Sequence, residues 1–204
     1  KGKQVVVIGG GDTGNDCVGT CIRLMASGVT QLEMMPAPPA ERAPQNPWPE
    51  WPRVLKTDYG QEEAIYCFGR DPRIYRTTVT EFVKGDDGAL KGVKTVELER
   101  VADEATGRFA MVPVKGTEGE LAADIVLIAA GFLGTEAYIA ERFSIGLNDR
   151  NNIASVSSSQ IYRTGSSHIF TAGDARTGQS LVVRAIADGR AAAVAVDESL
   201  MGCP

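Results

Sequence analysis

Three glycines near the N-terminus have the spacing that could bind a dinucleotide. Gly9, Gly11 and Gly14 follow the pattern G-x-G-x-x-G. In a dinucleotide fingerprint the first glycine permits a tight turn, the second lets the backbone approach a pyrophosphate, and the third lets a helix pack closely on a strand. Free N–H groups at the start of that helix then face the phosphates. The candidate ligand-binding residues of this segment are Gly9, Gly10, Gly11, Asp12, Thr13 and Gly14.

The fingerprint has meaning only between a strand and a helix, and the flanking sequence predicts both. Val5 to Ile8 is a short apolar run rich in β-branched residues, which suits a strand buried on both faces. We expect Gly28 to follow the end of the helix, at the C′ position. The alternative is a glycine-rich turn of another α/β protein that binds no ligand. The apolar residues that recur on one face of the predicted helix are Cys17, Val18, Cys21, Ile22 and Met25.

An acidic residue follows at the position that usually contacts a ribose. Val29 to Met35 reads as a second strand, and Glu33 lies near its end, about 20 residues after Gly14. A carboxylate there accepts hydrogen bonds from two ribose hydroxyls and repels a 2′-phosphate, which favours NADH. Arg42 in the following segment could instead reach a phosphate, so NADPH stays open. The alternative for Glu33 is a solvated carboxylate at a strand end.

The segment from Pro36 to Pro52 holds seven of the ten prolines and both tryptophans. Proline fixes φ and lacks a backbone donor, so we expect an ordered, extended loop. Indole rings are costly to leave in water. We therefore expect Trp48 and Trp51 to pack against a cofactor edge, the nucleotide domain or a partner domain. A surface linker is the alternative.

Three alternating runs follow, at Arg76 to Lys84, Leu90 to Val101 and Arg108 to Lys115. The turn Gly85 to Gly88 is typical of a hairpin, so the three runs predict an antiparallel meander. The apolar run from Ala123 to Ala129 comes next and predicts a buried parallel strand, whose carboxyl end would face a ligand crevice. Ala130 and Gly131 at that end are further candidate cofactor-binding residues.

Composition limits the class of protein. A chain of 204 residues suits one domain or one and a part, and a net charge of −5 argues mildly against nucleic acid or an anionic membrane as the main partner. No apolar run approaches the length of a membrane span. Four cysteines without a C-x-x-C pattern and a single histidine predict free thiols, a reducing compartment, and no metal or Fe–S site. The chain opens almost directly on a strand without a signal peptide, so we expect a region of a longer protein, cytoplasmic or in a plastid.

The C-terminal third carries a more specific pattern. Thr164 to Asp174, a strand that ends in Gly-Asp before a helical run from Leu181 to Leu200, resembles the second flavin fingerprint of two-dinucleotide flavoprotein reductases. With Asn46 to Arg53, Asp58 to Ala64 and Ala172 to Val183, nearly the whole chain resembles the small (β) subunit of glutamate synthase. The equivalent C-terminal region of the fused NADH-dependent enzyme is equally similar.

This resemblance implies an α/β fold of the Rossmann-like FAD/NAD(P)-binding type, with a parallel sheet, helices and an antiparallel three-stranded β-meander. It implies an NAD(P)H-binding domain with the meander at residues 1–134. Residues 135–204 would be the C-terminal return segment of an FAD-binding domain whose N-terminal part lies outside this sequence. The implied flavin contacts are Gly173, Asp174, Gln179, Ser180 and Leu181. Asp174 would bind the ribitol, and its alternative is a helix cap.

The implied activity is hydride transfer from NAD(P)H to FAD, with no catalytic side chain because the cofactors carry the chemistry. Electrons would pass through Fe–S clusters, held only by the missing N-terminal region, to a large (α) subunit or fused equivalent that makes glutamate from glutamine and 2-oxoglutarate. This stretch alone is expected to be inactive. The alternatives are a related module serving another acceptor, as in dihydropyrimidine dehydrogenase, and a non-catalytic binding or interaction domain. Thioredoxin reductase is disfavoured because its C-x-x-C is missing.

Overall fold

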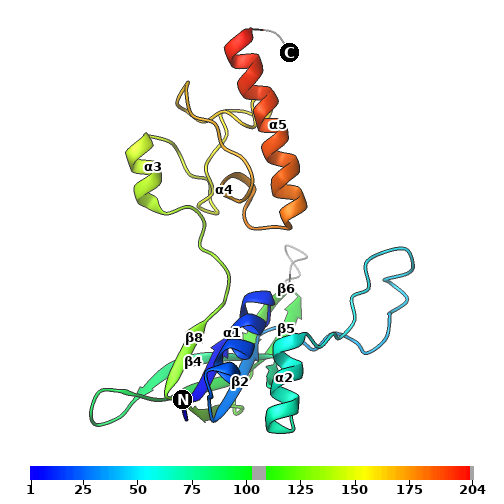
Figure 1. Cartoon of the computed structure of the whole chain (residues 1–204), viewed down its shortest axis with the longest axis vertical. Helices are drawn as coiled ribbons and strands as arrows, with labels where there is room; N and C mark the ends of the chain where they lie inside the picture. The colour runs from blue at the N-terminus through cyan, green and yellow to red at the C-terminus, as the bar shows by residue number, and fades with distance from the viewer. Residues whose placement is uncertain (103–108, 203–204) are drawn as a thin grey trace. The chain divides into compact units, whose positions relative to one another are not determined.

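The glycine-rich N-terminal segment folds as a strand, a turn and a helix. In the computed structural model, β1 (Gln4–Ile8) leads through the turn into α1 (Asp12–Arg23). The structure describes residues 1–102 and 109–202. It divides into two units, Lys1–Gly131 and Phe132–Pro204 (Figure 1).

A four-stranded parallel sheet forms the centre of the N-terminal unit. Its order is β3-β2-β1-β8, with β2 (Gly28–Glu33), β3 (Arg73–Tyr75) and β8 (Ile125–Ile128). Every neighbouring pair is parallel, so the carboxyl ends of these strands lie at one edge. Both predicted strands form, and they pair directly as β1 and β8. The expectation that the second one is buried is wrong, because β8 lies at the edge of this sheet and its Ile125 and Ile128 are exposed.

Strand β1 is buried on both faces, which explains its unbroken apolar run. Val5 and Val7 pack with Val18 of α1 and with Ala64 of α2 (Tyr59–Phe68). Val6 points to the opposite side, in a cluster with Leu32, Val93 and Ala123. Helices thus cover one face of the parallel sheet, and the antiparallel sheet covers the other.

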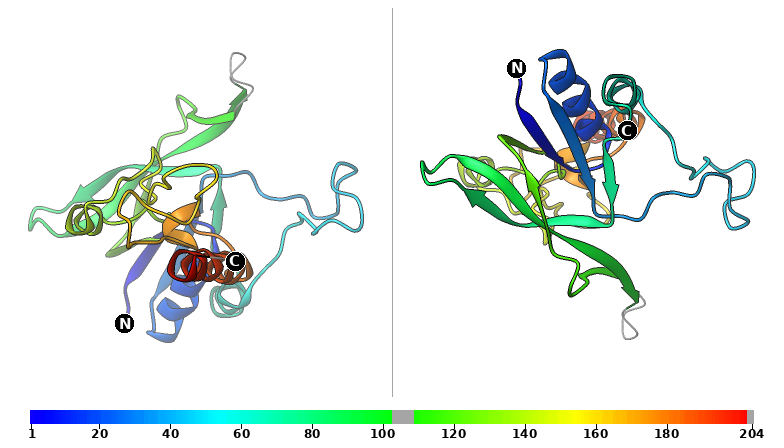
Figure 2. Two further views of the ribbon diagram at one scale, coloured as in Figure 1. Left: turned by 90° about the horizontal axis from the view of Figure 1, so that it is seen from above. Right: turned by 90° about the horizontal axis from the view of Figure 1, so that it is seen from below.

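The antiparallel sheet contains the predicted meander of β4 (Thr77–Lys84), β5 (Leu90–Ala102) and β6 (Phe109–Pro113). In Figure 2 its green strands cross the blue strands of the parallel sheet. Arg108, the first residue of the predicted third strand, lies outside the described residues. The sequence did not predict β7 (Gly119–Ala122), which pairs with the same strand, β5, as β6 does.

The break between β6 and β7 has a local cause. The N–H of Glu97 in β5 donates to Oγ1 of Thr117 at 3.0 Å, where a regular ladder would supply a backbone carbonyl. Thr117 Oγ1 in turn donates to the carbonyl of Val114 at 2.7 Å. A side chain therefore replaces the strand partner for one position, and pairing resumes at Gly119 opposite Thr95.

The C-terminal unit contains α3 (Ala137–Phe143), α4 (Asp174–Thr177) and α5 (Val182–Met201), and the last confirms the predicted helix. The strand predicted from Thr164 to Asp174 does not form, because Phe170 makes only an isolated bridge with Arg163. Its core is small and is formed by Ala140, Ile145 and Ile153. Along α5 only Ala192 is buried. No helix in the described part of the chain is both long and apolar enough to cross a membrane. The apolar side chains of α5 that are more than half exposed are Val182, Val183, Ile186, Val194, Leu200 and Met201.

The predicted end of α1 is wrong. The C-cap is Leu24, and Met25 adopts the left-handed conformation at φ 63° that we assigned to Gly28. Met25 is 61% exposed, so it does not belong to the packed helix face. Gly28 instead begins β2, where an added Cβ would collide with the side-chain oxygen of Gln4 in β1. Only the end of the exposed Gln4 side chain would have to move, so neither the turn nor the packing of the backbone requires a glycine here.

The register of the parallel sheet allows a direct test of its core. Leu32 is 1% exposed, and its register partner in β3, Ile74, is 37% exposed. Leu32→Ala should lower the free energy of unfolding by about 2–5 kcal/mol because the surrounding strands cannot close the cavity. Ile74→Ala is the matched control and should lose less than half as much. Urea unfolding measures both, and an equal or larger loss for Ile74→Ala would contradict this placement of the core.

Candidate functional site

The glycine turn is packed tightly on its inner side and open on its outer side. Gly9 has φ +128°, and a Cβ there would collide with the carbonyl of Ala129, next to β8. A Cβ on Gly14 would collide with the carbonyl of Gly9. Only glycine permits these approaches of backbone to backbone. At Gly11, in contrast, no atom lies within 4 Å of an added Cβ.

Helix α1 begins at this open side without a side-chain cap. Gly11 is the N-cap residue, and the first helical bond runs from Asn15 N–H to its carbonyl at 3.1 Å. The N–H groups of Asp12, Thr13 and Gly14 have no hydrogen-bond partner among the described residues. Unpaired N–H groups at the positive end of a helix favour an anionic ligand.

Glu33 lies beside the turn, as the fingerprint requires. Its carboxylate contacts the Cα side of Gly10 so closely that a Cβ there would overlap it. One carboxylate oxygen accepts from Met35 N–H at 2.7 Å, which holds the side chain at the end of β2. A cavity of about 260 Å³ opens at this point, and Gly10, Glu33, Lys56, Arg73 and Tyr75 are among its lining residues.

The sequence suggested Arg42 as a cation near Glu33, but Arg42 does not line this cavity. Arg42 donates to the carbonyls of Asn46, Pro47 and Glu50 at 3.0, 3.3 and 2.8 Å, all within its own loop. The cavity is lined instead by Lys56 and Arg73. Nothing in the local sequence marks either, because both reach the cavity from strands or loops far from Glu33 in the chain.

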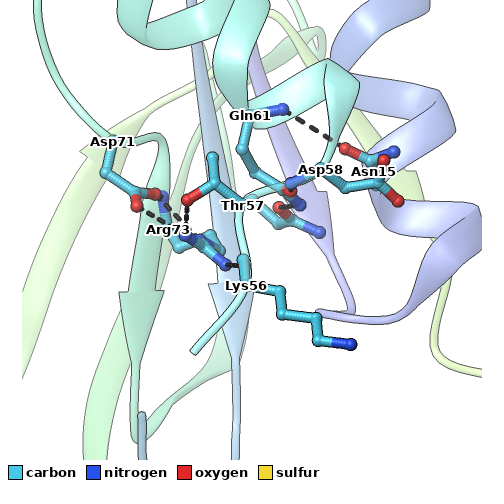
Figure 3. Close-up of polar contacts among 8 residues, drawn as sticks. Asn15, Lys56, Thr57, Asp58, Gln61, Asp71 and Arg73 are labelled. Atoms are coloured by element: carbon cyan, nitrogen blue, oxygen red, sulfur yellow. Dashed lines mark hydrogen bonds and ion pairs between the residues drawn. The ribbon is translucent and has the colours of Figure 1, made fainter. Parts of the chain in front are cut away.

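Arg73 is a structural clamp. Its Nε and Nη2 donate to the carboxylate of Asp71 at 2.9 and 2.7 Å, and Nη1 donates to the carbonyl of Lys56 at 2.7 Å (Figure 3). The hydrogen bond from Arg73 lowers the pKa of Asp71. Lys56 forms no ion pair within residues 1–102 and 109–202, and its ammonium lies 4.4 Å from the ring centre of Trp51. Of the two basic residues that line the cavity, Lys56 is thus the one whose charge is not paired with a carboxylate in the described residues.

The loop that carries the tryptophans extends away from the sheets (Figure 1). It is ordered around Asn46, whose buried side chain donates to the carbonyl of Trp51 at 3.0 Å and accepts from Arg53 N–H at 2.8 Å. Trp48 is 83% exposed and Trp51 is 78% exposed. Packing of these rings on the nucleotide-binding unit is therefore a wrong expectation. Their packing against a cofactor edge or a partner domain stays a prediction.

Ala130 and Gly131 follow β8 on the same edge of the parallel sheet as the glycine turn. The N–H of Ala129 donates to the carbonyl of Ile8 at 2.7 Å, so pairing with β1 continues just past the end of β8. Gly131 has φ +91° and is the last residue of the N-terminal unit. The predicted residues of this unit come together except for Arg42, which lies within its own loop.

In the C-terminal unit, Asp174 is the first residue of α4. Asp174 is exposed, and with Gln179 it lines a cavity of about 270 Å³. Gly173 is the N-cap residue of α4, and no side chain caps this helix, so Asp174 is not a cap. Ser180 and Leu181 come directly before α5, and Leu181 is its N-cap residue without a side-chain hydrogen bond.

Asp188 of α5, which the sequence did not reveal, holds this turn in place. Its carboxylate accepts from the N–H of Gly173 at 2.6 Å and from Nε of Arg176 at 3.0 Å, and it also pairs with Nη2 of Arg176. The hydrogen bond from Arg176, followed by that from Gly173, lowers the pKa of Asp188. The position of Asp174 thus depends on a carboxylate one helix further along the chain.

Comparisons with known proteins relate the chain to glutamate synthases. It is 45% identical over 202 residues to the protein named glutamate synthase [NADPH] small chain of Bacillus subtilis, which covers 99% of this chain and 40% of that protein. It is 42% identical over 201 residues to glutamate synthase [NADH] of Saccharomyces cerevisiae, which covers 98% of this chain and 9% of that protein. The chain therefore spans less than half of the length of these relatives. No protein-family model matches it.

A solved structure supports the fold. Mycobacterium tuberculosis FprA in complex with NADPH superposes with a TM-score of 0.65 at 14% identity, over 98% of this chain and 53% of that one. At this identity the likeness shows the fold alone. The fold is of the Rossmann-like α/β type, with a parallel sheet and an antiparallel sheet, as the sequence predicted.

The carboxylate of Asp188 predicts an acid-sensitive C-terminal unit. A carboxyl group with a lowered pKa in the folded state stabilises the fold fully above its unfolded pKa of about 4, and this contribution is lost as the pH falls through the folded value. Asp188→Asn should therefore cost about 1–3 kcal/mol at pH 7 and much less at pH 3. Urea unfolding at both pH values measures this. Asp197→Asn, an exposed position of the same helix, is the control, and an equal loss at both pH values would contradict the role of Asp188.

Proposed function

Because the chain matches glutamate synthases over 98–99% of its length, we propose that it is the NAD(P)H-binding part of a flavoprotein oxidoreductase. In this proposal hydride passes from NAD(P)H to FAD, and the electrons feed the synthesis of glutamate from glutamine and 2-oxoglutarate. The observation that carries the proposal is the glycine turn, which is open above Gly11 and continues into the uncapped start of α1.

The residues of the N-terminal unit fit a dinucleotide. Gly11 leaves room for a pyrophosphate, and the unpaired N–H groups of Asp12 and Thr13 are donors for its oxygens. Glu33, at the end of the next strand, is an acceptor for the hydroxyls of the adenosine ribose. These groups bind and orient the nucleotide, and none of them needs to donate or remove a proton.

Residues 135–204 are proposed as the return segment of an FAD-binding domain. The carboxylate of Asp174 is exposed and is a strong acceptor for ribitol hydroxyls, and Gly173 allows close approach beside it. Gln179, Ser180 and Leu181 lead into the uncapped start of α5, whose N–H groups suit the polar edge of a flavin. When bound, the nicotinamide supplies the hydride and the flavin accepts it.

The partners follow from the same proposal. The exposed apolar side chains of α5 are suited to burial under the remainder of a flavin domain. Fe–S clusters belong to a region outside this sequence, and the large (α) subunit or its fused equivalent receives the electrons. A reducing compartment, cytoplasmic or in a plastid, is consistent with the free thiols of Cys17, Cys21 and Cys67.

The nucleotide proposed is NADH. The carboxylate of Glu33 accepts from both hydroxyls of an unmodified ribose and repels a 2′-phosphate. Arg73 does not oppose this preference, because its guanidinium is engaged by Asp71 and by the carbonyl of Lys56. Lys56 is the one cation of the cavity that could favour NADPH, and its charge acts against Glu33.

Replacement of Gly11 tests the proposed function. Gly11 has φ −79° and open space at its Cβ position, so Gly11→Val should fold normally. The added side chain should nevertheless exclude the pyrophosphate and weaken NADH binding by about 10- to 100-fold, or about 1.4–2.8 kcal/mol. Calorimetric titration of the intact flavoprotein measures this. Gly165→Ala, also at an open position, is the control. A wild-type protein that is folded but binds neither NADH nor NADPH would refute the proposal.

The nucleotide preference has a separate test. Glu33→Gln removes the charge that repels a 2′-phosphate, so the ratio of kcat/KM for NADH to that for NADPH should fall about tenfold, or about 1.4 kcal/mol. Lys56→Met removes the opposing charge and should raise the same ratio. Steady-state reduction of an artificial acceptor by the intact protein measures both. A wild-type preference for NADPH that neither variant changes would contradict the assignment of Glu33.

A further inference from the structure

A line of buried amides runs from α2 to the inner side of the glycine turn. Gln31 of β2 is fully buried, and Gln61 of α2 is 4% exposed. The side-chain nitrogen of Gln61 donates to Oε1 of Gln31 at 3.1 Å. The side-chain nitrogen of Gln31 then donates to the carbonyl of Gly9 at 2.9 Å. Two long polar side chains inside a core require such partners, and here the last partner is the turn itself.

The direction of this amide relay is fixed at its outer end. Oε1 of Gln61 accepts from the N–H of Asp58 at 2.8 Å, in a capping box at the start of α2 (Figure 3). A backbone N–H can only donate, so the Gln61 amide must present its nitrogen to Gln31, and Gln31 must present its nitrogen to Gly9. The carbonyl of Gly9 can only accept, so every bond in the line has a donor and an acceptor in the correct order.

Two further contacts hold the outer end of the amide relay. The N–H of Gln61 donates to Oδ1 of buried Asn15 in α1 at 3.2 Å. Arg73 ties the chain just before Asp58 to β3 through the carbonyl of Lys56. Figure 3 shows both contacts on either side of Gln61. The relay is therefore anchored in α1, α2 and β3 before it reaches the turn.

The Gly9–Gly10 peptide is the kind of unit that needs such an anchor. Both residues are glycines, so rotation of the plane between them meets little steric resistance. In a trans peptide the C=O of one residue and the N–H of the next point in opposite directions. With the carbonyl of Gly9 held inward by Gln31, the N–H of Gly10 points outward to the open side of the turn. This N–H has no hydrogen-bond partner in the described part of the chain.

We propose that Gln31 and Gln61 are positioning residues of the dinucleotide site. They fix the Gly9–Gly10 peptide so that the N–H of Gly10 is presented to a pyrophosphate. Gln31 acts on the turn directly, and Gln61 acts through Gln31. The inference rests on the proposed function, and it adds two buried side chains that would act without touching the nucleotide.

The test compares a ligand that has a pyrophosphate with one that lacks it. Gln31→Met keeps the length of the side chain and removes the donor to Gly9. In the intact flavoprotein the Kd for ADP-ribose should rise about tenfold, whereas the Kd for adenosine should stay within about twofold. Calorimetry and ligand-observed NMR give the two values. Val29→Ala, a buried position of the same strand, is the control for lost stability and should leave the ratio of the two Kd values unchanged.

Two more variants keep the test decisive. Gln61→Met should raise the Kd for ADP-ribose about threefold, because the bond from Gln31 to Gly9 remains but is less constrained. Gln61→Met also replaces Gln31→Met in the test if Gln31→Met does not fold. The double variant should have the same Kd for ADP-ribose as Gln31→Met alone, because Gln61 acts on the turn only through Gln31.

The outcomes separate this inference from the proposed function. Equal losses for ADP-ribose and adenosine, or an unchanged Kd for ADP-ribose, would overturn the positioning role while wild-type binding stands. Failure of the folded wild type to bind ADP-ribose would overturn the proposed function itself, and the inference with it.

Discussion

The N-terminal unit depends on a contact of backbone with backbone at Gly9. Three elements meet there, because the carbonyl of Ala129 lies against one side of Gly9 and Gly14 of α1 lies against its carbonyl. No side chain separates β1, β8 and α1 at this point, so the helix starts directly at the edge of the sheet. The positive end of α1 is thereby brought to the carboxyl ends of the parallel strands, where open α/β sheets bind their ligands.

This close packing leaves polar backbone groups that must be satisfied from within. The carbonyl of Gly9 lies against Gly14 and receives its hydrogen bond from the buried amide of Gln31. A similar solution occurs in the C-terminal unit, where the carboxylate of Asp188 accepts from the N–H of Gly173. In both units a side chain from a neighbouring element fixes the glycine turn, so the geometry of each turn depends on residues that lie outside it.

The elements that depend mainly on interactions between residues close in the chain were predicted correctly. Four such elements have residue patterns that are compatible with few other local structures, and all four are confirmed. They are the strand at Val5 to Ile8, the turn at Gly9 to Gly14, the hairpin after Lys84 and the helix after Leu181. Strands β3 and β7 were missed because each is short and is defined by its pairing with a strand distant in the chain, β2 and β5 respectively. Arg42 was chosen for its nearness in the chain to Glu33, whereas Arg73 approaches through pairing of β2 with β3. Lys56 is held there by the hydrogen bond from Arg73 to its carbonyl. Gln31 read as an ordinary strand residue, and only the tertiary structure shows it beneath the turn.

The placement of the aromatic side chains decides what optical signals can report. Both tryptophans lie in the extended loop around Asn46, and each is largely exposed. Their fluorescence emission therefore reports on that loop and should change little when the two sheets unfold. The ammonium of Lys56 lies over the indole of Trp51, and Lys56 is also one of the residues that line the cavity beside Glu33. A change of charge in that cavity is thus coupled to one chromophore, while Trp48 provides an internal reference a few residues away.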